Sequence, residues 1–525
     1  MCTNNESHNE SEISNWYASK NIFITGATGF MGKVLVEKLL RDCQDLNCLY
    51  LLMREKKGAS VIERKEQYFK CLIFDKVFKR DPHVLKKIKI IKGDVLEKGL
   101  GICDSDLHEL ISKVDIIFHC AANVRFDQPL RPMIEMNVGG THKMLQLAEK
   151  LTNLKVVVHV STSYCQCNES ILEERPYQPP NDPHEILAMV RSLDENALQE
   201  VTPRLLKGLP NTYAYSKALA EGLVQSFNRK FPIVICRPSI VTASLKEPLP
   251  GWVEGVNGPT GLMIAGARGV LRSMHCNPDY PATIIPVDTA INALIAAAWD
   301  CGSKLENDVN YINVCVSNKL LMTWGESIES GKRFFYETPL SFSLWYPNGS
   351  IKKNYYEHLF CVIFFHYLPA YFIDFLLLII GRKPFLIKVQ KKISGGLSLL
   401  QYYTTKTWEF KNEKFCQLNS KLNYVDREIF NICQEQINWE QYIRSYIHGM
   451  RTFMLKETDA SLPKARKLLT RLYIVDRIVK LTFVIVTFTL LWINIDTMIA
   501  RGDAILKNAL DMFIKNDNTT LVLNT

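Results

Sequence analysis

The stretch Asn21-Ile-Phe-Ile-Thr-Gly-Ala-Thr-Gly-Phe-Met-Gly-Lys33 decides the fold of this chain. It opens as a short buried strand, three spaced glycines follow, and residues 33–40 show the apolar periodicity of a helix. Strand, glycine turn and helix in this order form the setting that a dinucleotide site requires. Gly26 permits the tight turn, Gly29 lets backbone amides approach a pyrophosphate, and Gly32 lets the helix pack on the strand. The stretch predicts the phosphates of a cofactor at the helix N-terminus.

Three further residues of this turn, Thr28, Phe30 and Met31, are expected to contact the cofactor. The next predicted strand, residues 47–52, ends in the mostly basic run Met53-Arg-Glu-Lys-Lys57. An NAD site usually places an acidic residue at this strand end, whereas an NADP site uses arginine. Arg54 therefore favours NADPH, held by a charge-assisted contact with the 2′-phosphate. A solvated charged loop is the alternative.

Strands and helices continue to alternate through the first half of the chain. Buried runs at 89–94, 114–122, 155–160 and 232–239 are separated by a long amphipathic helix at 133–151 and by a helix containing residues 213–217. This alternation predicts an α/β fold with a parallel, doubly wound sheet, whose ligands bind outside the carboxyl ends of the strands. Residues at or beyond those ends are predicted to share one crevice, with Asp94 near the adenine: Gly26, Arg54, Asp94, Val95, Ala121, Ser163 and Pro238.

The catalytic candidates Tyr213 and Lys217 occur in Asn211-Thr-Tyr-Ala-Tyr-Ser-Lys217. Four residues apart on a helix, the phenol and the ammonium lie on one face, one turn apart. A nearby ammonium favours the phenolate, so we expect a lowered tyrosine pKa and proton transfer near neutral pH. The pattern by itself also fits a half-buried tyrosine beside a solvated lysine.

Taken together, these motifs resemble the extended short-chain dehydrogenase/reductase superfamily. The resemblance rests on the glycine turn, Gly93-Asp94, His119-Cys-Ala-Ala122, Asn137-Val-Gly-Gly-Thr141, Ser161-Thr-Ser163 and the Tyr213–Lys217 spacing. It implies that Tyr213 gives a proton to a substrate carbonyl, and that Lys217 lowers the tyrosine pKa and holds the nicotinamide ribose. A hydroxyl of the 161–163 run would polarise the carbonyl, with Ser163 favoured over Thr162. Asn137 aligns with the proton-relay asparagine of the superfamily.

Between residues 168 and 210 lies a polar insertion that the core nucleotide fold does not need. A helix is expected at 184–200. Insertions near the active-site face of such sheets often shape the substrate mouth, and a plain surface loop is the alternative.

The second half begins with a strongly apolar and aromatic segment, residues 354–380. It is long enough to span a bilayer, which takes about 20 residues. His366, Pro369 and Asp374 interrupt it, and polar groups are costly inside a membrane. We interpret the segment as a hydrophobic helical hairpin that docks on the catalytic domain, lines an acyl pocket or dips into the membrane surface.

Further motifs of the second half resemble the C-terminal domain of alcohol-forming fatty acyl-CoA reductases, especially those of insects. They are Gly381-Arg-Lys-Pro384, Lys388-Val-Gln390, Trp408 and the Trp439–Tyr442 spacing, and Cys236-Arg-Pro-Ser-Ile-Val241 of the first half matches as well. The resemblance implies NADPH-dependent reduction of fatty acyl-CoA to a primary alcohol through an aldehyde. A sterol or other lipid dehydrogenase and a non-catalytic NADPH-binding membrane scaffold are the alternatives.

A second apolar run, 481–495, predicts a transmembrane or membrane-anchoring helix at 474–495, if the residues from Ile474 to Lys480 join it. Six basic residues precede this run between 464 and 480, and three follow it up to 515. The positive-inside bias therefore places the catalytic half in the cytosol, on the endoplasmic reticulum or peroxisomal membrane. A buried core helix is the alternative.

Length and charge bound the remaining possibilities. The 525 residues leave room for a polar tail (1–18), a catalytic domain (19–320), a helical domain (321–470), the anchor and a final tail (496–525). A net charge of +9 favours an anionic lipid surface or the phosphates of CoA as partners over nucleic acid. The 15 cysteines show no zinc-type spacing, and no metal site is expected. The polar first residues predict no signal peptide.

Overall fold

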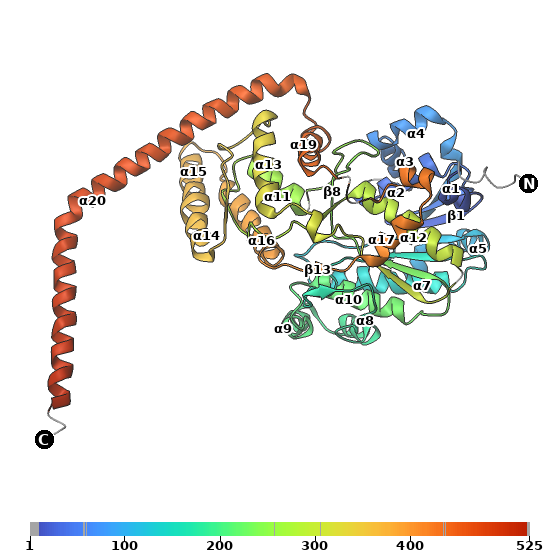
Figure 1. The fold of residues 1–525 in the computed structure, drawn as a ribbon, viewed down its shortest axis with the longest axis horizontal. Helices are drawn as coiled ribbons and strands as arrows, with labels where there is room; N and C mark the ends of the chain where they lie inside the picture. Colours follow the sequence, from blue (N-terminus) through green and yellow to red (C-terminus); the bar gives the residue numbers. More distant parts are fainter. Residues whose placement is uncertain are drawn as a thin grey trace, which may run out of the picture.

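The computed structural model describes residues 10–521, apart from 56, 57, 59, 257, 305, 434 and 436. Its centre is a seven-stranded sheet of order β11-β7-β5-β4-β1-β2-β3, in which every neighbouring pair is parallel (Figure 1). The predicted doubly wound α/β sheet is confirmed. The strands are β1 Asn21–Thr25, β2 Cys48–Met53, β3 Ile88–Lys92, β4 Ile116–His119, β5 Val156–Val160, β7 Ile233–Cys236 and β11 Val309–Ile312.

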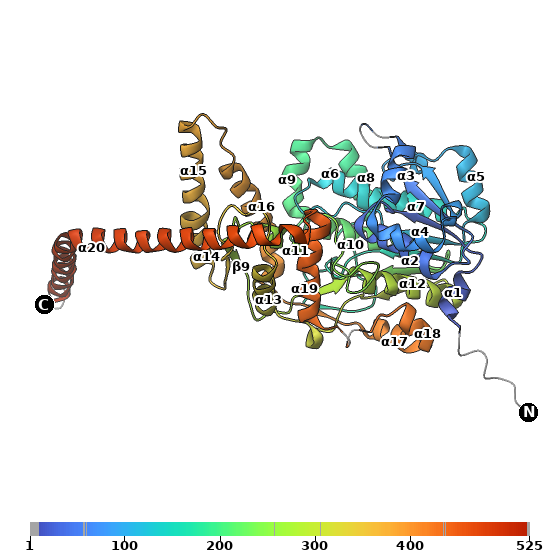
Figure 2. The ribbon, with the colours of Figure 1, turned by 90° about the horizontal axis from the view of Figure 1, so that it is seen from above.

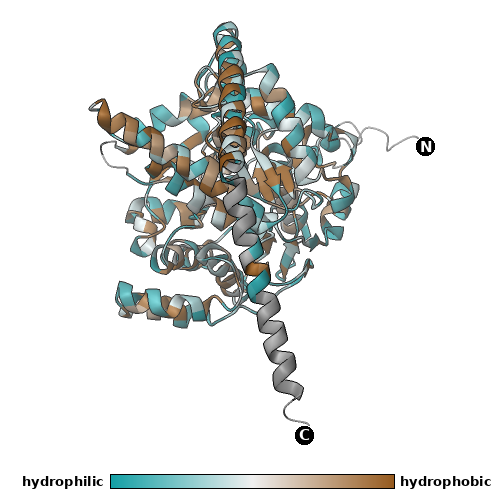
Figure 3. Ribbon diagram, turned by 90° about the vertical axis from the view of Figure 1, so that its left-hand side faces the viewer, coloured by the Kyte–Doolittle hydropathy of each residue, from teal (hydrophilic) through white to brown (hydrophobic). Residues whose placement is uncertain are grey.

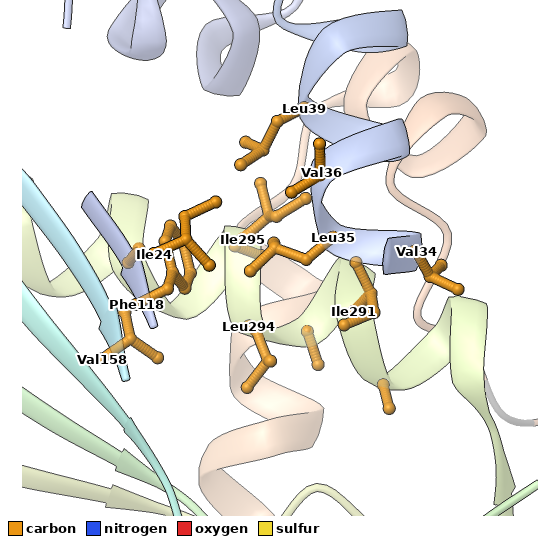
Figure 4. Packing of buried hydrophobic residues seen from close by; sticks show 14 of the residues in the cluster. Ile24, Val34, Leu35, Val36, Leu39, Phe118, Val158, Ile291, Leu294 and Ile295 are labelled. Carbon is orange, nitrogen blue, oxygen red and sulfur yellow. The ribbon is translucent and has the colours of Figure 1, made fainter. Parts of the chain in front are cut away.

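Helices cover both faces of this sheet because successive strand residues point to opposite sides. Ile24 of β1 faces the core beneath α2 (Phe30–Asp42) and α12 (Val287–Lys304). Phe23, its neighbour, faces the core beneath α7 (Gly140–Ala148) and α10 (Thr212–Gln225), and Figure 2 shows the two helical layers. Figure 4 shows side chains that fill the first core: Ile24, Leu35, Leu39, Phe118, Val158, Ile291, Leu294 and Ile295.

The predicted helix at 133–151 begins earlier than expected and contains a wide turn. α6 (Leu130–Ile134) runs through the π-helical turn η4 (Glu135–Gly139) into α7. The other helical segments of the first half are α3 Val61–Phe69, η1 Leu72–Phe74, α4 Asp75–Arg80, η2 Val84–Lys87, η3 Lys98–Gly101 and α5 Asp104–Lys113.

The N-terminal segment is not a plain polar tail. Residues 1–9 lie outside the described residues, but Glu12–Tyr17 forms helix α1. Ile13 and Tyr17, four residues apart, are fully buried, and the Tyr17 hydroxyl donates to the Ile295 carbonyl at 3.0 Å. Apolar residues on one helical face therefore attach this segment to α12.

The insertion contains two helices where one was expected at 184–200. They are α8 (Pro183–Ser192) and α9 (Glu195–Leu205). The break occurs because the Asp194 side chain accepts hydrogen bonds from the backbone amides of Asn196 and Ala197, which starts a new helix.

The C-terminal region is mostly helical, as expected. The predicted boundary at residue 320 falls between β11 and α13, and two short parallel pairs connect its two sides: β12 with β9 and β13 with β6. The remaining elements are β6 Ile171–Leu172, β8 Ile240–Thr242, α11 Gly258–Ala267, β9 Ser273–His275, β10 Ile284–Pro286, η5 Asn318–Leu320, α13 Trp324–Glu337, β12 Ser350–Lys352, β13 Glu409–Phe410, α17 Glu413–Lys421, α18 Tyr424–Ile429, α19 Trp439–Gly449, η7 Met450–Met454 and η8 Asp459–Ser461.

The apolar segment 354–380 is one continuous helix and not a hairpin within itself. α14 (Tyr355–Cys361), the π-helical turn η6 (Val362–Tyr367) and α15 (Leu368–Ile379) follow one another without a break. The hairpin forms with the next helix, α16 (Leu386–Thr404). His366 accepts from the Arg272 and Ser273 amides, and Asp374 accepts from three amides at the start of α16. Asp374 and the Nε2 atom of His366 thus find partners inside the protein, whereas the buried Nδ1 atom of His366 has none among the described residues.

The last helix, α20, runs from Leu462 to Leu521 and contains the predicted anchor at 474–495 (Figure 1). Most of its described apolar side chains between 473 and 493 are exposed, and Figure 3 shows the apolar colouring of this helix beside that of the hairpin. The charged residue Asp476 on the same stretch is buried instead, and its carboxylate accepts from Trp345 Nε1 at 2.8 Å. The predicted tail 496–525 continues the helix as far as Leu521, and residues 522–525 lie outside the described residues.

Candidate active site

The glycine turn lies between the end of β1 and the start of α2. Gly26 has a φ of +73°, and a Cβ there would lie 2.6 Å from the Ala121 backbone nitrogen. A Cβ on Gly32 would lie 2.2 Å from the Gly26 carbonyl oxygen. Gly29 is the N-cap of α2 and offers no side-chain cap, so the first amides of the helix stay available to an anion. The turn therefore fits a pyrophosphate.

The other predicted residues of this turn face different surroundings. The Phe30 ring stacks on Trp252 at 5.3 Å between centroids, Met31 packs against the core beneath α2, and Thr28 is half-buried. Phe30 thus connects the cofactor turn to the segment that follows β8.

Two residues predicted for the adenosine end lie side by side. Arg54, after β2, is paired with Asp94, after β3, at 3.3 Å, and their side chains are 58% and 22% exposed. The Arg64 guanidinium donates to the Arg54 carbonyl, so a second cation lies beside the first. Val95 is buried against Gly140. Lys56 and Lys57 of the basic run lie outside the described residues.

Asn137 joins the loop after β4 to α10. Its side chain exchanges two hydrogen bonds with the Asn123 backbone, at 2.7 and 3.0 Å, and donates to the Ser216 hydroxyl at 2.9 Å. Ser216 is the neighbour of Lys217 on α10. Pro238, predicted for the same crevice, accepts from the Ser163 amide at 3.0 Å. The structure thus brings these predicted residues to the carboxyl ends of adjacent strands.

Tyr213 and Lys217 both lie on α10 and are almost fully buried. The Lys217 ammonium donates to the Val160 carbonyl at 2.7 Å, and burial lowers the Lys217 pKa to about 8. Burial raises the pKa of the Tyr213 phenol, and a hydrogen bond with Thr162 opposes part of that rise. The predicted lowering of the tyrosine pKa is therefore wrong for this arrangement, because desolvation has the largest effect on the pKa of the phenol.

The hydroxyl that meets Tyr213 belongs to Thr162 and not to Ser163. Thr162 is hydrogen-bonded with the tyrosine side chain. Ser163, which motif position favours, donates its hydroxyl to the Arg237 carbonyl at 2.7 Å. The buried Ser161 hydroxyl has no hydrogen-bond partner among the described residues. The geometry therefore favours Thr162 as the hydroxyl beside Tyr213.

Aromatic residues that the sequence reasoning missed surround Tyr213. Phe126 stacks on the Tyr213 ring at 5.3 Å, and Tyr403 lies 5.4 Å from Phe126 and 5.1 Å from Tyr164. Tyr403 comes from α16, so the C-terminal region closes one side of the site. Asn211 could have been found as the N-cap of α10, since asparagine before a helical run is a typical start signal. No local pattern indicates the contributions of Phe126 and Tyr403.

A buried ion pair lies between α10 and the insertion. Arg237 is fully buried, and its guanidinium pairs with Glu221 of α10 at 2.7 Å. The same guanidinium donates to the carbonyls of Glu173 and Arg175 in the insertion. It therefore fixes the insertion to the catalytic helix.

Solved structures support the fold. The terminal reductase domain of the myxalamid PKS-NRPS pathway aligns with 82% of this chain and 90% of its own, with a TM-score of 0.54 and 18% identity. The reductase domain of a nonribosomal peptide synthetase from Mycobacterium tuberculosis aligns with 83% of this chain and 92% of its own, with a TM-score of 0.54 and 15% identity.

Sequence comparisons identify the family. Two male sterility protein families match, an NAD-binding one over residues 24–294 and a second one over residues 365–457. Fatty acyl-CoA reductase 1 of Xenopus laevis is 38% identical over 91% of this chain and 92% of its own length. Fatty acyl-CoA reductase 1 of Homo sapiens is 36% identical over 88% of this chain and 89% of its own. The chain therefore belongs to the fatty acyl-CoA reductase family, as the sequence motifs predict.

Proposed function

We propose that this protein reduces long-chain fatty acyl-CoA to a primary alcohol, with NADPH as the reductant in two successive steps. The observation that carries the proposal is the buried cluster of Thr162, Tyr213 and Lys217 at the carboxyl ends of the central strands. Such a cluster can act on many carbonyl compounds, and membership of the fatty acyl-CoA reductase family favours the thioester carbonyl of a fatty acyl-CoA.

The residues of the cofactor crevice fit a dinucleotide phosphate. The uncapped N-terminus of α2 supplies amides for the pyrophosphate. Arg54 and Arg64 place two guanidinium groups beside the end of β2, where the 2′-phosphate distinguishes NADPH from NADH. When bound, the nicotinamide supplies a hydride to the substrate carbonyl.

The residues of this chain stabilise the charge that develops on the carbonyl oxygen. Thr162 donates a hydrogen bond to the oxyanion, and Tyr213 delivers the proton. Lys217 holds a positive charge one helical turn away and would bind the nicotinamide ribose of the cofactor. The buried positions of all three side chains exclude water, which strengthens each of these interactions.

Two hydride transfers are needed because the carbonyl carbon of a thioester is four electrons more oxidised than that of a primary alcohol. The first produces a hemithioacetal, which releases CoA and leaves an aldehyde. The second reduces that aldehyde at the same hydroxyl cluster, so Tyr213 supplies a proton in both rounds. Each acyl-CoA therefore consumes two NADPH and yields one alcohol and one CoA.

Membrane association is part of the proposal and rests on the two apolar helices. The segment 355–379 has 25 residues, which is roughly 37 Å of helix at 1.5 Å per residue and exceeds a bilayer core of about 30 Å. Only 17% of its most apolar window is buried. The basic residues between 464 and 480 keep the catalytic half cytosolic, on the endoplasmic reticulum or peroxisomal membrane.

Product analysis tests the function. Purified full-length protein in lipid nanodiscs is incubated with NADPH and a panel of acyl-CoAs, and mass spectrometry measures alcohol, aldehyde and CoA. We expect alcohol with two NADPH oxidised per thioester, and no turnover of Tyr213→Phe despite nearly unchanged NADPH binding. Aldehyde as the sole product contradicts the two-step reaction, and reduction of a sterol ketone in place of acyl-CoA contradicts the substrate class.

A further inference from the structure

A cavity of about 180 Å³ lies in the C-terminal region, outside the residues assigned so far. It is partly open and is lined by residues of α11, α13, α19 and the β9–β12 pair. Most of its lining is apolar, including Met263, Leu271, Met274, Ile284, Phe335 and Ile447. Apolar cavities of about 150 Å³ stay dry and bind apolar groups as large as benzene.

Several polar side chains of the lining already have partners within the protein. The hydroxyl of Thr242 is hydrogen-bonded with Tyr442 at 2.6 Å, and that of Tyr446 with Thr260 at 2.6 Å. Ser273 is bonded to a histidine of α14 at 2.8 Å. A ligand therefore finds little unsatisfied hydrogen-bonding capacity here, which favours a hydrocarbon over a polar group.

One end of the cavity lies close to the catalytic hydroxyls. Ala282 and Ile284 both line it, and Thr283 between them is hydrogen-bonded with the hydroxyl of Tyr164. Tyr164 directly follows Ser163. On the cofactor side, Phe30 of the glycine turn belongs to the apolar cluster that also includes Met263 of the lining. Thr283 and Phe30 thus connect the lining of the cavity to the residues after β5 and to the glycine turn.

The other end approaches the membrane-associated helices. Tyr336, which lines the cavity, stacks on Tyr346 at 5.7 Å between centroids. Tyr346 in turn contacts Tyr473 of α20 at 5.2 Å. Tyr336 and Tyr346 therefore connect the lining of the cavity to the first exposed apolar turns of α20.

We propose that this cavity binds the methyl-terminal part of the fatty acyl chain and determines the preferred chain length. The inference rests on the proposed function, because it assigns the apolar half of that substrate. A chain whose thioester carbonyl meets Thr162 and Tyr213 runs past Thr283 and places its far methylenes among Met263, Phe335 and Ile447. Shorter chains leave the cavity empty and lose that burial.

Two glycines of the lining allow the cavity to be filled without disturbing the backbone. A Cβ on Gly266 of α11 meets no atom within 4 Å, and one on Gly331 of α13 meets only Ile447 Cδ1 at 4.0 Å. Leucine at either position therefore projects into open space that an acyl chain would otherwise occupy. Gly395 of α16 also has nothing within 4 Å of a Cβ and does not line the cavity, so Gly395→Leu is the matched control.

The test compares palmitoyl-CoA with octanoyl-CoA in the full-length protein. We expect Gly266→Leu and Gly331→Leu to lower kcat/KM for palmitoyl-CoA by roughly tenfold or more, while octanoyl-CoA and the KM for NADPH stay within about twofold of wild type. Gly395→Leu should change neither substrate. An equal loss for both chain lengths, or no loss for either, overturns the assignment.

A second measurement does not depend on turnover. A palmitoyl-CoA analogue with a diazirine near its methyl end is photolysed on the protein, and the labelled peptides are identified by mass spectrometry. We expect labelling of α11, α13 or α19 in the wild type, and loss of that labelling in Gly331→Leu. Labelling confined to other elements overturns the inference. If the wild type forms no alcohol yet is labelled as expected, the proposed reaction fails and the chain site stands.

Discussion

Asn211 donates a hydrogen bond of 3.0 Å from its side-chain amide to the hydroxyl of Tyr403, 192 residues further along the chain. The same asparagine caps α10, because its side-chain oxygen Oδ1 accepts from the Ala214 backbone amide at 2.9 Å. Tyr403 lies near the end of α16, and Asp374 of α15 binds the amides at the start of α16. Helix α16 therefore connects α15 to α10, the helix that carries Tyr213.

Removal of the Tyr403 hydroxyl tests this connection. Tyr403→Phe keeps the ring against Phe126 but leaves the buried Asn211 amide without its partner, a loss of about 1–3 kcal/mol. If that energy positions Tyr213, kcat falls by about fivefold to 150-fold with an unchanged KM for NADPH. Tyr402→Phe is the control, because its hydroxyl bonds the Cys167 carbonyl and not α10. Equal steady-state kinetics for both variants contradicts a positioning role.

The two neighbouring hydroxyls after β5 should respond differently to mutation. Thr162→Val keeps the shape of the side chain and removes the group beside Tyr213, so kcat should fall by about 100-fold to 1,000-fold, as for other oxyanion donors. Ser163→Ala removes a bond to the Arg237 carbonyl and should cost about 1 kcal/mol of stability with a much smaller change in kcat. Steady-state kinetics and thermal unfolding separate the two effects, and the reverse pattern assigns the role to Ser163.

Local patterns predicted the parts of the site that depend on local backbone geometry. The turn at Gly26 and the Tyr213–Lys217 pair lie within single strand–turn–helix units, so glycine spacing and helical periodicity are sufficient. The choice between Thr162 and Ser163 depends on side-chain direction at a strand end, where neighbours point to opposite sides. Tyr403 arrives from a distant helix, and no local pattern carries that contact.

The same limit applies to the apolar helix at 355–379. Its sequence predicts an interruption at His366 and Asp374, because isolated polar groups are costly in an apolar segment. The structure keeps the helix continuous because backbone amides of β9 and α16 donate to His366 Nε2 and to the Asp374 carboxylate. Only the tertiary partners show that these two residues join the helix to the protein.

The pH dependence of the reaction should reflect Lys217. Burial lowers its pKa to about 8, so the ammonium is present below that pH and is lost as the pH rises through it. We expect kcat/KM to be steady near neutral pH and to fall above about pH 8. Lys217→Arg keeps its charge at alkaline pH, so its residual activity should lack this decline. A wild-type profile that stays flat to pH 10 contradicts a role for the lysine charge.

The buried pair of Arg237 and Glu221 should dominate the stability of the insertion. Arg237→Leu leaves the Glu221 carboxylate buried without its partner, which typically costs about 3–5 kcal/mol. Arg175→Ala breaks an exposed pair with Glu173 and should cost less than about 1 kcal/mol. Thermal unfolding in the same detergent compares the two variants, and similar losses contradict the assigned importance of the buried pair.

The preference for NADPH over NADH should depend on the charge of Arg54, which follows β2. Arg54→Asp places a carboxylate where the 2′-phosphate of NADPH would lie, so the KM for NADPH should rise by about 10-fold to 100-fold and that for NADH should fall. Lys92→Ala is the matched control, since it removes a nearby exposed cation that pairs with Glu55. Steady-state kinetics with both cofactors decides the matter: an unchanged preference in Arg54→Asp, or an equal shift in Lys92→Ala, removes Arg54 from this role.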